Sequence, residues 1–398
     1  MRDAIQKLTE DVRTHIRARP EVGGDEDIRR YSEDRVSTNR EYAGLSVAER
    51  IRVVDTVLYK TRKKLSILQP FVDDGSVSEI MVNGPRDIFI EKAGRVMRAD
   101  AEFDGTEELE EVMRRIAADV HREINELTPI LDARLADGSR VNAVYKNVAL
   151  NGPILTIRKF PESRITMDEL LAYGTITQAA ADFLIKLVQA AYNIFISGGT
   201  SSGKTTFLNV LSNFIPKHER IVTIEDAAEL QISALENIVK LECRSANANG
   251  KGGVGMTQLI RASLRMRPDR IIVGEVRGAE VLDMIQAMNT GHSGSLSTGH
   301  ANSPAGMLYR LEAMFLQAAD YPIAAIRRQI TEGIDILVHL GRIGGGRRVA
   351  LEISEITGMV DGEITLNKLF DYSPERGLFR TGNPLRDQTK LKMKGMKW

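Results

Sequence analysis

The sequence has one cysteine, few aromatic residues and no long apolar run. Cys243 alone cannot form an internal disulfide or a cysteine-based zinc site, which favours a reducing compartment. No stretch approaches the roughly 20 predominantly apolar residues that a membrane-spanning helix needs. The first residues carry mixed charge and lack the apolar core of a secretory signal. We therefore expect a cytoplasmic protein.

An excess of either charge is also lacking, because 54 Lys+Arg face 54 Asp+Glu. Nucleic-acid-binding proteins usually carry an excess of basic residues, so we expect no direct contact with nucleic acid. A local basic patch remains at the C-terminus, where Arg386, Lys390, Lys392, Lys394 and Lys397 outnumber Asp387. We predict that this tail is a frayed, solvated terminus; contact with anionic lipid or a partner is the alternative.

The chain divides into three regions by pattern. Its 398 residues and 42% hydrophobic content suit two or three domains with buried cores. Residues 1–65 show helical spacing of apolar residues in two stretches, and Ser46 with Glu49 forms a capping signature before the second. Residues 66–162 contain short alternating segments and one helix, which predicts an α+β domain. Residues 163–398 alternate strands with helices and end in a hairpin around Asp361-Gly362.

The alternation in the third region predicts an α/β fold. We expect strands over 193–197, 221–225, 271–274 and 295–298, each separated from the next by helical segments. Strands joined by helices form a mainly parallel sheet that is covered on both faces.

The sharpest pattern is a phosphate-binding loop between a strand and a helix. It matches G-x-x-x-x-G-K-[ST] and follows a run of β-branched and aromatic residues. Glycines let backbone N–H groups face the phosphates, the helix N-terminus adds a favourable dipole, and the lysine reaches the β and γ oxygens. An ordinary glycine-rich turn is the alternative, but the strand and helix context favours nucleotide binding. The residues of this predicted loop are Gly198, Gly199, Thr200, Ser201, Ser202, Gly203, Lys204, Thr205 and Thr206.

Two further strand ends carry carboxylates. Glu225, Asp226 and Glu229 follow one apolar strand, and Glu275 follows another in the position of a Walker-B acid. An ATPase needs a carboxylate that orients or deprotonates water, and usually one that reaches Mg²⁺. We predict that Glu275 has such a role. For Glu225 and Asp226, helix capping or a solvated loop explains the residues equally well.

Two histidines, His292 and His300, bracket the strand at 295–298. Metal binding is disfavoured because no cysteine or third histidine lies close in the sequence. A neutral imidazole that senses the γ-phosphate through a hydrogen bond fits better. From the residues alone, a histidine that is merely satisfied near the core remains an equal alternative.

Together these patterns resemble the type II/type IV secretion ATPase superfamily, the GspE/PilT-like ATPases. The order and spacing of four motifs carry the resemblance: the phosphate loop, an acidic box at 224–229, Gly274-Glu275-Val276-Arg277, and a histidine box that ends at His300. The strings at 135–142, 265–278 and 286–292 are similar to the CpaF branch, the motors of tight-adherence (Tad) pili.

The resemblance implies a homohexameric ring with a RecA-like C-terminal ATPase domain, and Mg-ATP held between it and the α+β domain. In that family, hydrolysis acts by way of membrane platform proteins to drive pilus subunits out of or back into the inner membrane. The resemblance therefore implies a motor that is cytoplasmic and peripheral at the inner membrane. By the resemblance, Lys204 and Thr205 hold phosphate and Mg²⁺, and Glu275 is the water-activating base. Glu229 supports metal or water, and His300 senses the γ-phosphate. The implied metal set is thus Thr205, Glu229 and Glu275.

Arginines of the α+β domain are also expected to reach the phosphates. Arg134, Arg140 and Arg158 match the family strings, and the sequence does not decide which of them engages or from which subunit. Such a group would stabilise charge on the transferring phosphoryl group. Without the family, all three are explained as surface charges at strand edges.

Departures from the family and other functions remain open at this point. Many relatives have an apolar residue where this chain has Gly299, so we expect that strand to be loosened. The Gly/Asn-rich segment 246–255 predicts a mobile loop, with contact to a neighbour or to the pore as the alternative. A RecA-like nucleic-acid translocase is a second functional hypothesis, and a nucleotide-gated scaffold that barely hydrolyses ATP is a third.

Overall fold

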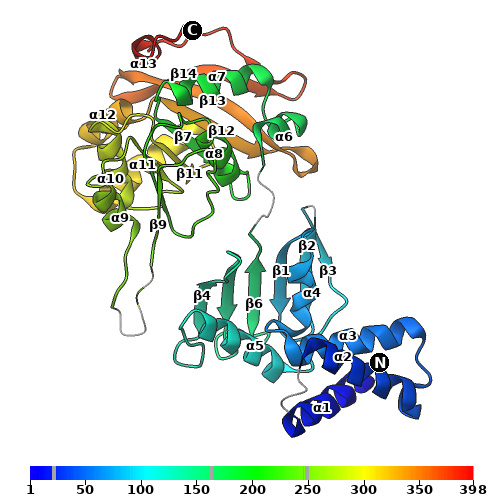
Figure 1. Ribbon diagram of the computed structural model, residues 1–398. Helices are drawn as coiled ribbons and strands as arrows, with labels where there is room; N and C mark the ends of the chain where they lie inside the picture. Colours follow the sequence, from blue (N-terminus) through cyan, green and yellow to red (C-terminus); the bar gives the residue numbers. More distant parts are fainter. Residues whose placement is uncertain (20–23, 93, 161–164, 245, 247–250, 398) are drawn as a thin grey trace. The chain divides into compact units, whose positions relative to one another are not determined.

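The computed structural model describes residues 1–398 apart from 20–23, 93, 161–164, 245, 247–250 and 398. The chain forms two compact units, residues 1–162 and residues 163–398 (Figure 1). Each unit has its own hydrophobic cores. Among the described residues, none of the helices combines the length and the apolar character that crossing a bilayer requires.

Unit 1 begins with three helices that share one small core. They are α1 (Arg2–Ala18), α2 (Asp25–Thr38) and α3 (Val47–Arg62), and α3 starts at the predicted capping box of Ser46 and Glu49. The sequence patterns indicated α1 and α3 but not α2. The reason is that α2 buries only Ile28, Ser32 and Val36, so its apolar face is narrow and includes a serine.

The rest of unit 1 is an antiparallel sheet with a helix, as predicted for an α+β domain. The strand order is β3-β2-β1-β6-β5-β4. Helix α5 (Thr106–Asp119) buries Leu109, Val112, Met113 and Ile116 in the same core as the inward residues of the strands. The strands are β1 (Val77–Asn83), β2 (Ile88–Lys92), β3 (Arg95–Arg98), β4 (Ile130–Arg134), β5 (Arg140–Val144) and β6 (Ile154–Arg158).

Unit 2 is built on a nine-stranded sheet in the order β15-β14-β13-β12-β7-β11-β10-β8-β9. Six neighbouring strands of this sheet, β12-β7-β11-β10-β8-β9, are parallel to one another. The predicted hairpin extends the sheet beyond β12 with antiparallel strands. The α/β class and the mainly parallel sheet are therefore confirmed. The parallel strands are β7 (Ile194–Gly198), β8 (Ile221–Glu225), β9 (Ile238–Glu242), β10 (Arg270–Val273), β11 (Leu296–His300) and β12 (Ile336–Arg342). The antiparallel strands are β13 (Arg348–Val360), β14 (Glu363–Ser373) and β15 (Gly377–Arg380).

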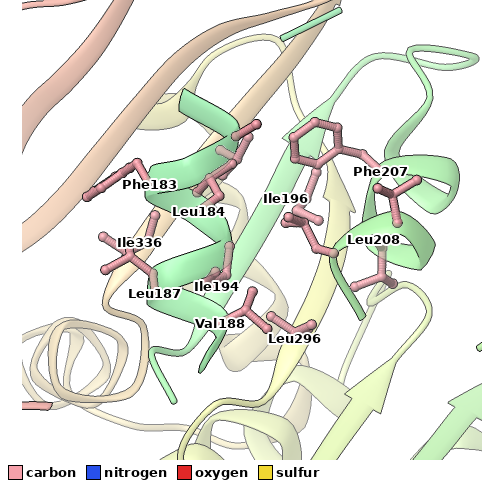
Figure 2. Close-up of a cluster of buried hydrophobic side chains, with 14 of the residues drawn as sticks. Phe183, Leu184, Leu187, Val188, Ile194, Ile196, Phe207, Leu208, Leu296 and Ile336 are labelled. Atoms are coloured by element: carbon pink, nitrogen blue, oxygen red, sulfur yellow. The ribbon is translucent and has the colours of Figure 1, made fainter. Parts of the chain in front are cut away.

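Helices pack on both faces of this sheet, and alternate strand residues serve the two cores. Ile194 and Ile196 of β7 pack with α7 and α8 (Figure 2). Phe195 between them belongs to the core on the other face. On the first face lie α6 (Met167–Ala172), α7 (Gln178–Gln189) and α8 (Lys204–Ser212). On the second lie α9 (Met256–Ser263), α10 (Glu280–Asn289), α11 (Pro304–Ala318) and α12 (Ile323–Gly333).

The prediction of a frayed, solvated C-terminus is wrong. Leu385 and Leu391, the latter in the short helix α13 (Thr389–Met393), are each 1% exposed and belong to the core around α7. Lys390 places its ammonium 2.5 Å from the carboxylate of Asp335, the residue before β12. Burial raises the pKa of the Asp335 carboxyl, and the neighbouring Lys390 ammonium opposes that rise. The basic tail is therefore tied to the sheet by one of its own charges.

Two other predictions concern the Gly/Asn segment and the strand that contains Gly299. Four residues of the Gly/Asn segment 246–255 that was predicted to be a mobile loop, 247–250, lie outside the described residues. The expected loosening of β11 at Gly299 is wrong, because β11 pairs with β7 in register through Gly299 and His300. A Cβ at Gly299 would lie 2.9 Å from Met307 and 3.0 Å from Phe195, so the glycine permits close packing there.

We predict that Lys390→Met lowers the free energy of unfolding by about 1–3 kcal/mol, since it leaves the half-buried Asp335 carboxylate without its cationic partner. Urea unfolding followed by far-UV circular dichroism measures the change. Lys392→Met is the matched control, because this substitution removes the same charge from the same helix at an exposed position. Equal midpoints for the two variants would show that the Lys390 pair does not stabilise the fold.

Candidate functional site

The predicted site residues of unit 2 meet at one edge of the sheet. In the parallel register, Gly198 at the end of β7 lies beside His300 at the end of β11. Val273 of β10 pairs with both Ser297 of β11 and Ile224 of β8, so Gly274 and Glu225 follow at the same level. Because parallel strands end at a common edge, four separate sequence motifs come together here.

The phosphate loop has a backbone that only small residues allow. A Cβ at Gly198 would lie 2.5 Å from the Leu340 carbonyl oxygen and from the Ser202 hydroxyl. Ser201 and Gly203 have φ of +56° and +94°, in the left-handed region. Arg348 of β13 donates from Nε to the Ser201 carbonyl at 3.0 Å, which fastens the outer side of the loop.

The loop leads into α8 without a side-chain cap. Gly203 is the residue before the helix, and no side chain accepts from the first N–H groups of α8. The hydroxyl of Ser202 is buried and has no hydrogen-bond partner among the described residues. Unsatisfied donors at a helix N-terminus, next to an orphaned hydroxyl, make a site that suits an anion such as a phosphate.

Lys204 lies at the head of a short chain of polar contacts. Its Nζ donates to the Gly199 carbonyl at 2.9 Å and to Nδ1 of His300 at 3.2 Å. Because an ammonium only donates, Nδ1 of His300 must accept, which places the ring proton on Nε2. That Nε2 lies 2.8 Å from Oε1 of Glu275, in a contact that is not aligned as a hydrogen bond. Arg277 donates to the other oxygen of Glu275 at 2.8 Å and 3.1 Å.

The charges of this chain agree with a neutral imidazole. Burial lowers the pKa of His300, and the cations of Lys204 and Arg277 lower it further, while Glu275 opposes them. Burial likewise lowers the pKa of Lys204, with Glu275 opposing. The hydrogen bond to Glu275 raises the pKa of Arg277. A lowered pKa favours the uncharged imidazole at neutral pH, which is the state that the sequence analysis expected for His300.

The acidic box divides into structural and exposed positions. Glu225 is buried, and its Oε2 accepts from the backbone N–H groups of Glu229 and Leu230 at 2.7 Å and 3.0 Å. Glu225 therefore shapes the loop that carries Glu229, which settles its open alternative in favour of loop capping. Glu229 is half-buried and acts electrostatically on Arg277, whereas Asp226 is exposed, 3.7 Å from the same guanidinium. Among the described residues, no group of three or more His, Cys, Asp or Glu side chains could hold a metal ion by itself.

The three predicted arginines lie in unit 1, in one row across neighbouring strands. Arg134 of β4 is opposite Arg140 of β5, and Arg140 is opposite Arg158 of β6. Directly opposed residues point to the same face of a sheet. Each arginine has a sequence neighbour that faces the core: Ala133, Val141 and Ile157. Because successive residues of a strand point to opposite faces, the arginines occupy the other face. Arg134 also donates to the Gly138 carbonyl at 3.1 Å, which holds the turn between β4 and β5.

Sequence reasoning missed three residues at or beside the site. Arg277 is the last residue of the motif at 274–277, but the sequence analysis predicted no role for it. Its position two residues after Glu275 was a usable signal. Arg348 and His339 gave no local signal, because each reaches its partner across the sheet. His339 of β12 is buried, and its Nδ1 lies 2.9 Å from the Ser197 hydroxyl under the phosphate loop. His292, in contrast, contacts the Ala287 carbonyl before β11 begins, away from His300.

Known proteins resemble this chain along most of its length. Residues 61–342 match the family described as type II/IV secretion system protein. A putative conjugal transfer protein of Mycobacterium tuberculosis is 33% identical over 348 residues, covering 86% of this chain and 96% of that protein. The type IV secretion system protein PtlH of Bordetella pertussis is 35% identical over 315 residues, covering 73% of this chain and 93% of that protein.

A solved structure shares the fold. The pilus retraction motor PilT with bound ADP aligns with a TM-score of 0.56 at 19% identity, covering 78% of this chain and 84% of that one. The resemblance inferred from the four motifs is thus confirmed at the level of the superfamily. With a family match that runs from residue 61 to residue 342, the chain belongs to the type II/IV secretion system protein family.

Proposed function

We propose that the chain is a Mg²⁺-dependent motor ATPase that works as a homohexamer. It couples ATP hydrolysis to the assembly or disassembly of a pilus, or to type II/IV secretion, at the inner membrane. The observation that carries the proposal is the contact chain from Lys204 through His300 to Glu275, which links the phosphate loop to a Walker-B acid. The finer assignment, to the CpaF branch and a tight-adherence pilus, rests on the strings at 135–142, 265–278 and 286–292.

The residues present fit a nucleotide phosphate with Mg²⁺. The uncapped start of α8 and the orphaned Ser202 hydroxyl provide donors for phosphate oxygens, and Lys204 adds a positive charge. Thr205, at the second position of α8, would hold Mg²⁺ by its hydroxyl, with Glu275 and Glu229 as further candidates. Mg²⁺ when bound neutralises phosphate charge.

The contact chain supports a way for phosphate binding to reach the catalytic base. Lys204 is engaged by the Gly199 carbonyl and by His300, so a phosphate that attracts Lys204 also changes the partner of His300. His300 in turn contacts Glu275, whose Oε1 is buried and accepts no hydrogen bond among the described residues. A carboxylate oxygen without a hydrogen-bond donor can orient a water molecule and take its proton. We infer that His300 reports γ-phosphate occupancy to Glu275.

The arginine row supports a role for unit 1 in hydrolysis. Arg134, Arg140 and Arg158 place three guanidinium groups side by side on the face of the sheet opposite the core. Guanidinium groups present forks of donors that match phosphate oxygens. We propose that one or more of these guanidinium groups reaches the phosphates and stabilises the charge that develops during transfer.

The partners follow from the relatives rather than from the site. One relative is named a type IV secretion system protein and another a putative conjugal transfer protein. We propose that this chain likewise serves a membrane machine, through inner-membrane platform proteins, and associates with the membrane peripherally through them. Direct contact with nucleic acid is not part of the proposal, because the net charge is zero.

We predict that Glu275→Gln retains ATP binding and stops hydrolysis, since the amide cannot take a proton from water. Mg²⁺-dependent phosphate release is measured on fractions separated by size, with and without added DNA. Glu236→Gln, at an exposed position of the same unit, is the matched control. Activity in a ring-sized fraction that is lost in Glu275→Gln and indifferent to DNA supports the motor.

Other outcomes of this assay identify the competing functions. DNA-stimulated turnover would favour a nucleic-acid translocase. ATP binding with negligible turnover in every fraction would favour a nucleotide-gated scaffold. A normal rate in Glu275→Gln would move the base to Glu229 or elsewhere.

We predict that Lys204→Ala weakens nucleotide binding or abolishes hydrolysis, because it removes the charge that the loop places on the phosphates. Equilibrium binding of a fluorescent ATP analogue and the rate of phosphate release measure the two effects. Lys217→Ala removes a charge from an exposed position in unit 2 and is expected to change neither. Full activity in Lys204→Ala would refute the assignment of the phosphate loop.

We predict that Arg134→Ala or Arg140→Ala lowers kcat roughly hundredfold, the order of magnitude for losing one transition-state donor. The melting temperature is recorded in parallel, because Arg134 also holds the turn at Gly138. Arg95→Ala is the control, since Arg95 is an exposed arginine on β3 of the same sheet. If neither variant changes the rate beyond the control, the proposed contact between these arginines and phosphate fails.

A further inference from the structure

A second concave, polar site lies in unit 1, in the angle between three helices. The cavity has a volume of about 320 Å³, at the lower end of the range for ligand pockets. Helix α1 contributes two residues to it, the end of α3 two more, and α5 the last two. The lining residues are Arg13, Arg17, Lys60, Thr61, Glu111 and Arg115.

The charges around this cavity do not cancel. Lys60 is buried and already neutralised by Asp104 and Glu108, at 2.7 Å and 3.0 Å. Arg115 pairs with Glu111 at 2.8 Å, which uses the single carboxylate of the lining. Arg13 and Arg17 form no ion pair and no side-chain hydrogen bond with any described residue of the chain. The cavity thus presents an excess of guanidinium groups to solvent.

Arg13 and Arg17 concentrate positive charge on one side of the cavity. They are four residues apart on one face of α1, where like charges repel, and Glu10, three residues before Arg13, is placed to offset only part of that repulsion. Arg17 gains from its place in the last turn of α1, where a cation suits the helix dipole. The interaction of Arg17 with the helix dipole does not explain why Arg13 and Arg115 line the same cavity.

We propose that this cavity binds a compact anion with clustered phosphate groups. Guanidinium groups present planar forks of donors that match phosphate oxygens, and several forks around one hollow suit more than one phosphate. Thr61 adds a hydroxyl at the wall. The phosphates belong either to a soluble molecule or to the headgroup of a lipid. The proposal concerns residues of unit 1 alone and does not rest on the proposed ATPase function.

Binding there would join the N-terminal helices to the α+β domain. Helix α1 belongs to the first small core, whereas α5 belongs to the core of the six-stranded sheet. An anion held by Arg13 and Arg17 on one side and Arg115 on the other would cross-link these cores. Ligand binding to the folded state raises its stability, so the melting temperature rises with ligand concentration.

The test uses inorganic pyrophosphate as the soluble probe, titrated calorimetrically into full-length Lys204→Ala protein so that the phosphate loop contributes little. Arg13→Gln/Arg17→Gln removes the two arginines while keeping good helix formers. Arg30→Gln/Arg40→Gln is the matched control, since both residues are exposed in the same helical region. Far-UV circular dichroism and the unliganded melting temperature confirm that both double variants are folded.

We expect the affinity for pyrophosphate to fall roughly tenfold or more in Arg13→Gln/Arg17→Gln and to stay unchanged in the control, because charge-assisted hydrogen bonds are lost. The affinity should also fall as salt rises. Co-sedimentation with phosphatidylcholine vesicles, with or without cardiolipin, forms the second arm. Binding only to cardiolipin vesicles, lost in the same variant, would identify a lipid headgroup as the source of the phosphates.

Two results would overturn the proposal. One is no measurable binding of pyrophosphate or of cardiolipin vesicles by protein with an intact cavity. The other is an equal loss in both double variants, which would show a general effect of charge. Neither result depends on ATP hydrolysis, so the fate of this proposal is separate from that of the phosphate loop.

Discussion

The site depends on the close fit of β7 between its two neighbours in the sheet. Every residue of β7 is buried, so the strand is apolar on both faces up to Ser197, whose hydroxyl contacts His339. At that end, Gly198 lies so near the Leu340 carbonyl that no side chain fits. The backbone can then turn into the phosphate loop, and the register with β11 brings His300 within reach of Lys204. A shift of one residue between β7 and β11 would reverse the faces and separate these two side chains.

Much of this fold could be predicted because its signals are local. The capping box of α3, the apolar run of β7 and the Asp361-Gly362 hairpin each lie within a few residues. The C-terminus could not be predicted in this way. Lys390 reads as a solvated charge until Asp335, 55 residues away in the chain, is found beside it. Long-range pairing of that kind leaves no periodic pattern, and composition alone pointed to the wrong answer.

The same contrast between local signals and long-range contacts explains which site residues could be predicted. The motif spacing predicted Lys204, Glu275 and His300, and the structure brings those three together because their strands are parallel. Motif spacing could not separate the roles of Glu225 and Glu229, because the deciding contacts are hydrogen bonds that backbone N–H groups donate to the Glu225 carboxylate. Arg348 reaches the loop across 147 residues of sequence, so only the folded sheet reveals it.

Zero net charge excluded a global attraction for polyanions, but it does not describe the charge at any one place. Interactions between exposed charges fade over about 8–10 Å at ordinary salt, so an anion responds to local clusters rather than to the sum. Unit 1 shows that the chain can neutralise a cation where the fold requires it, since Lys60 has two carboxylate partners. Arg13 and Arg17 border the same cavity as Lys60 and have no such partner among the described residues. Glu10 stands three residues before Arg13 on α1 but forms no ion pair with either arginine in the described part of the chain, so the charge at this cavity remains available to a bound anion.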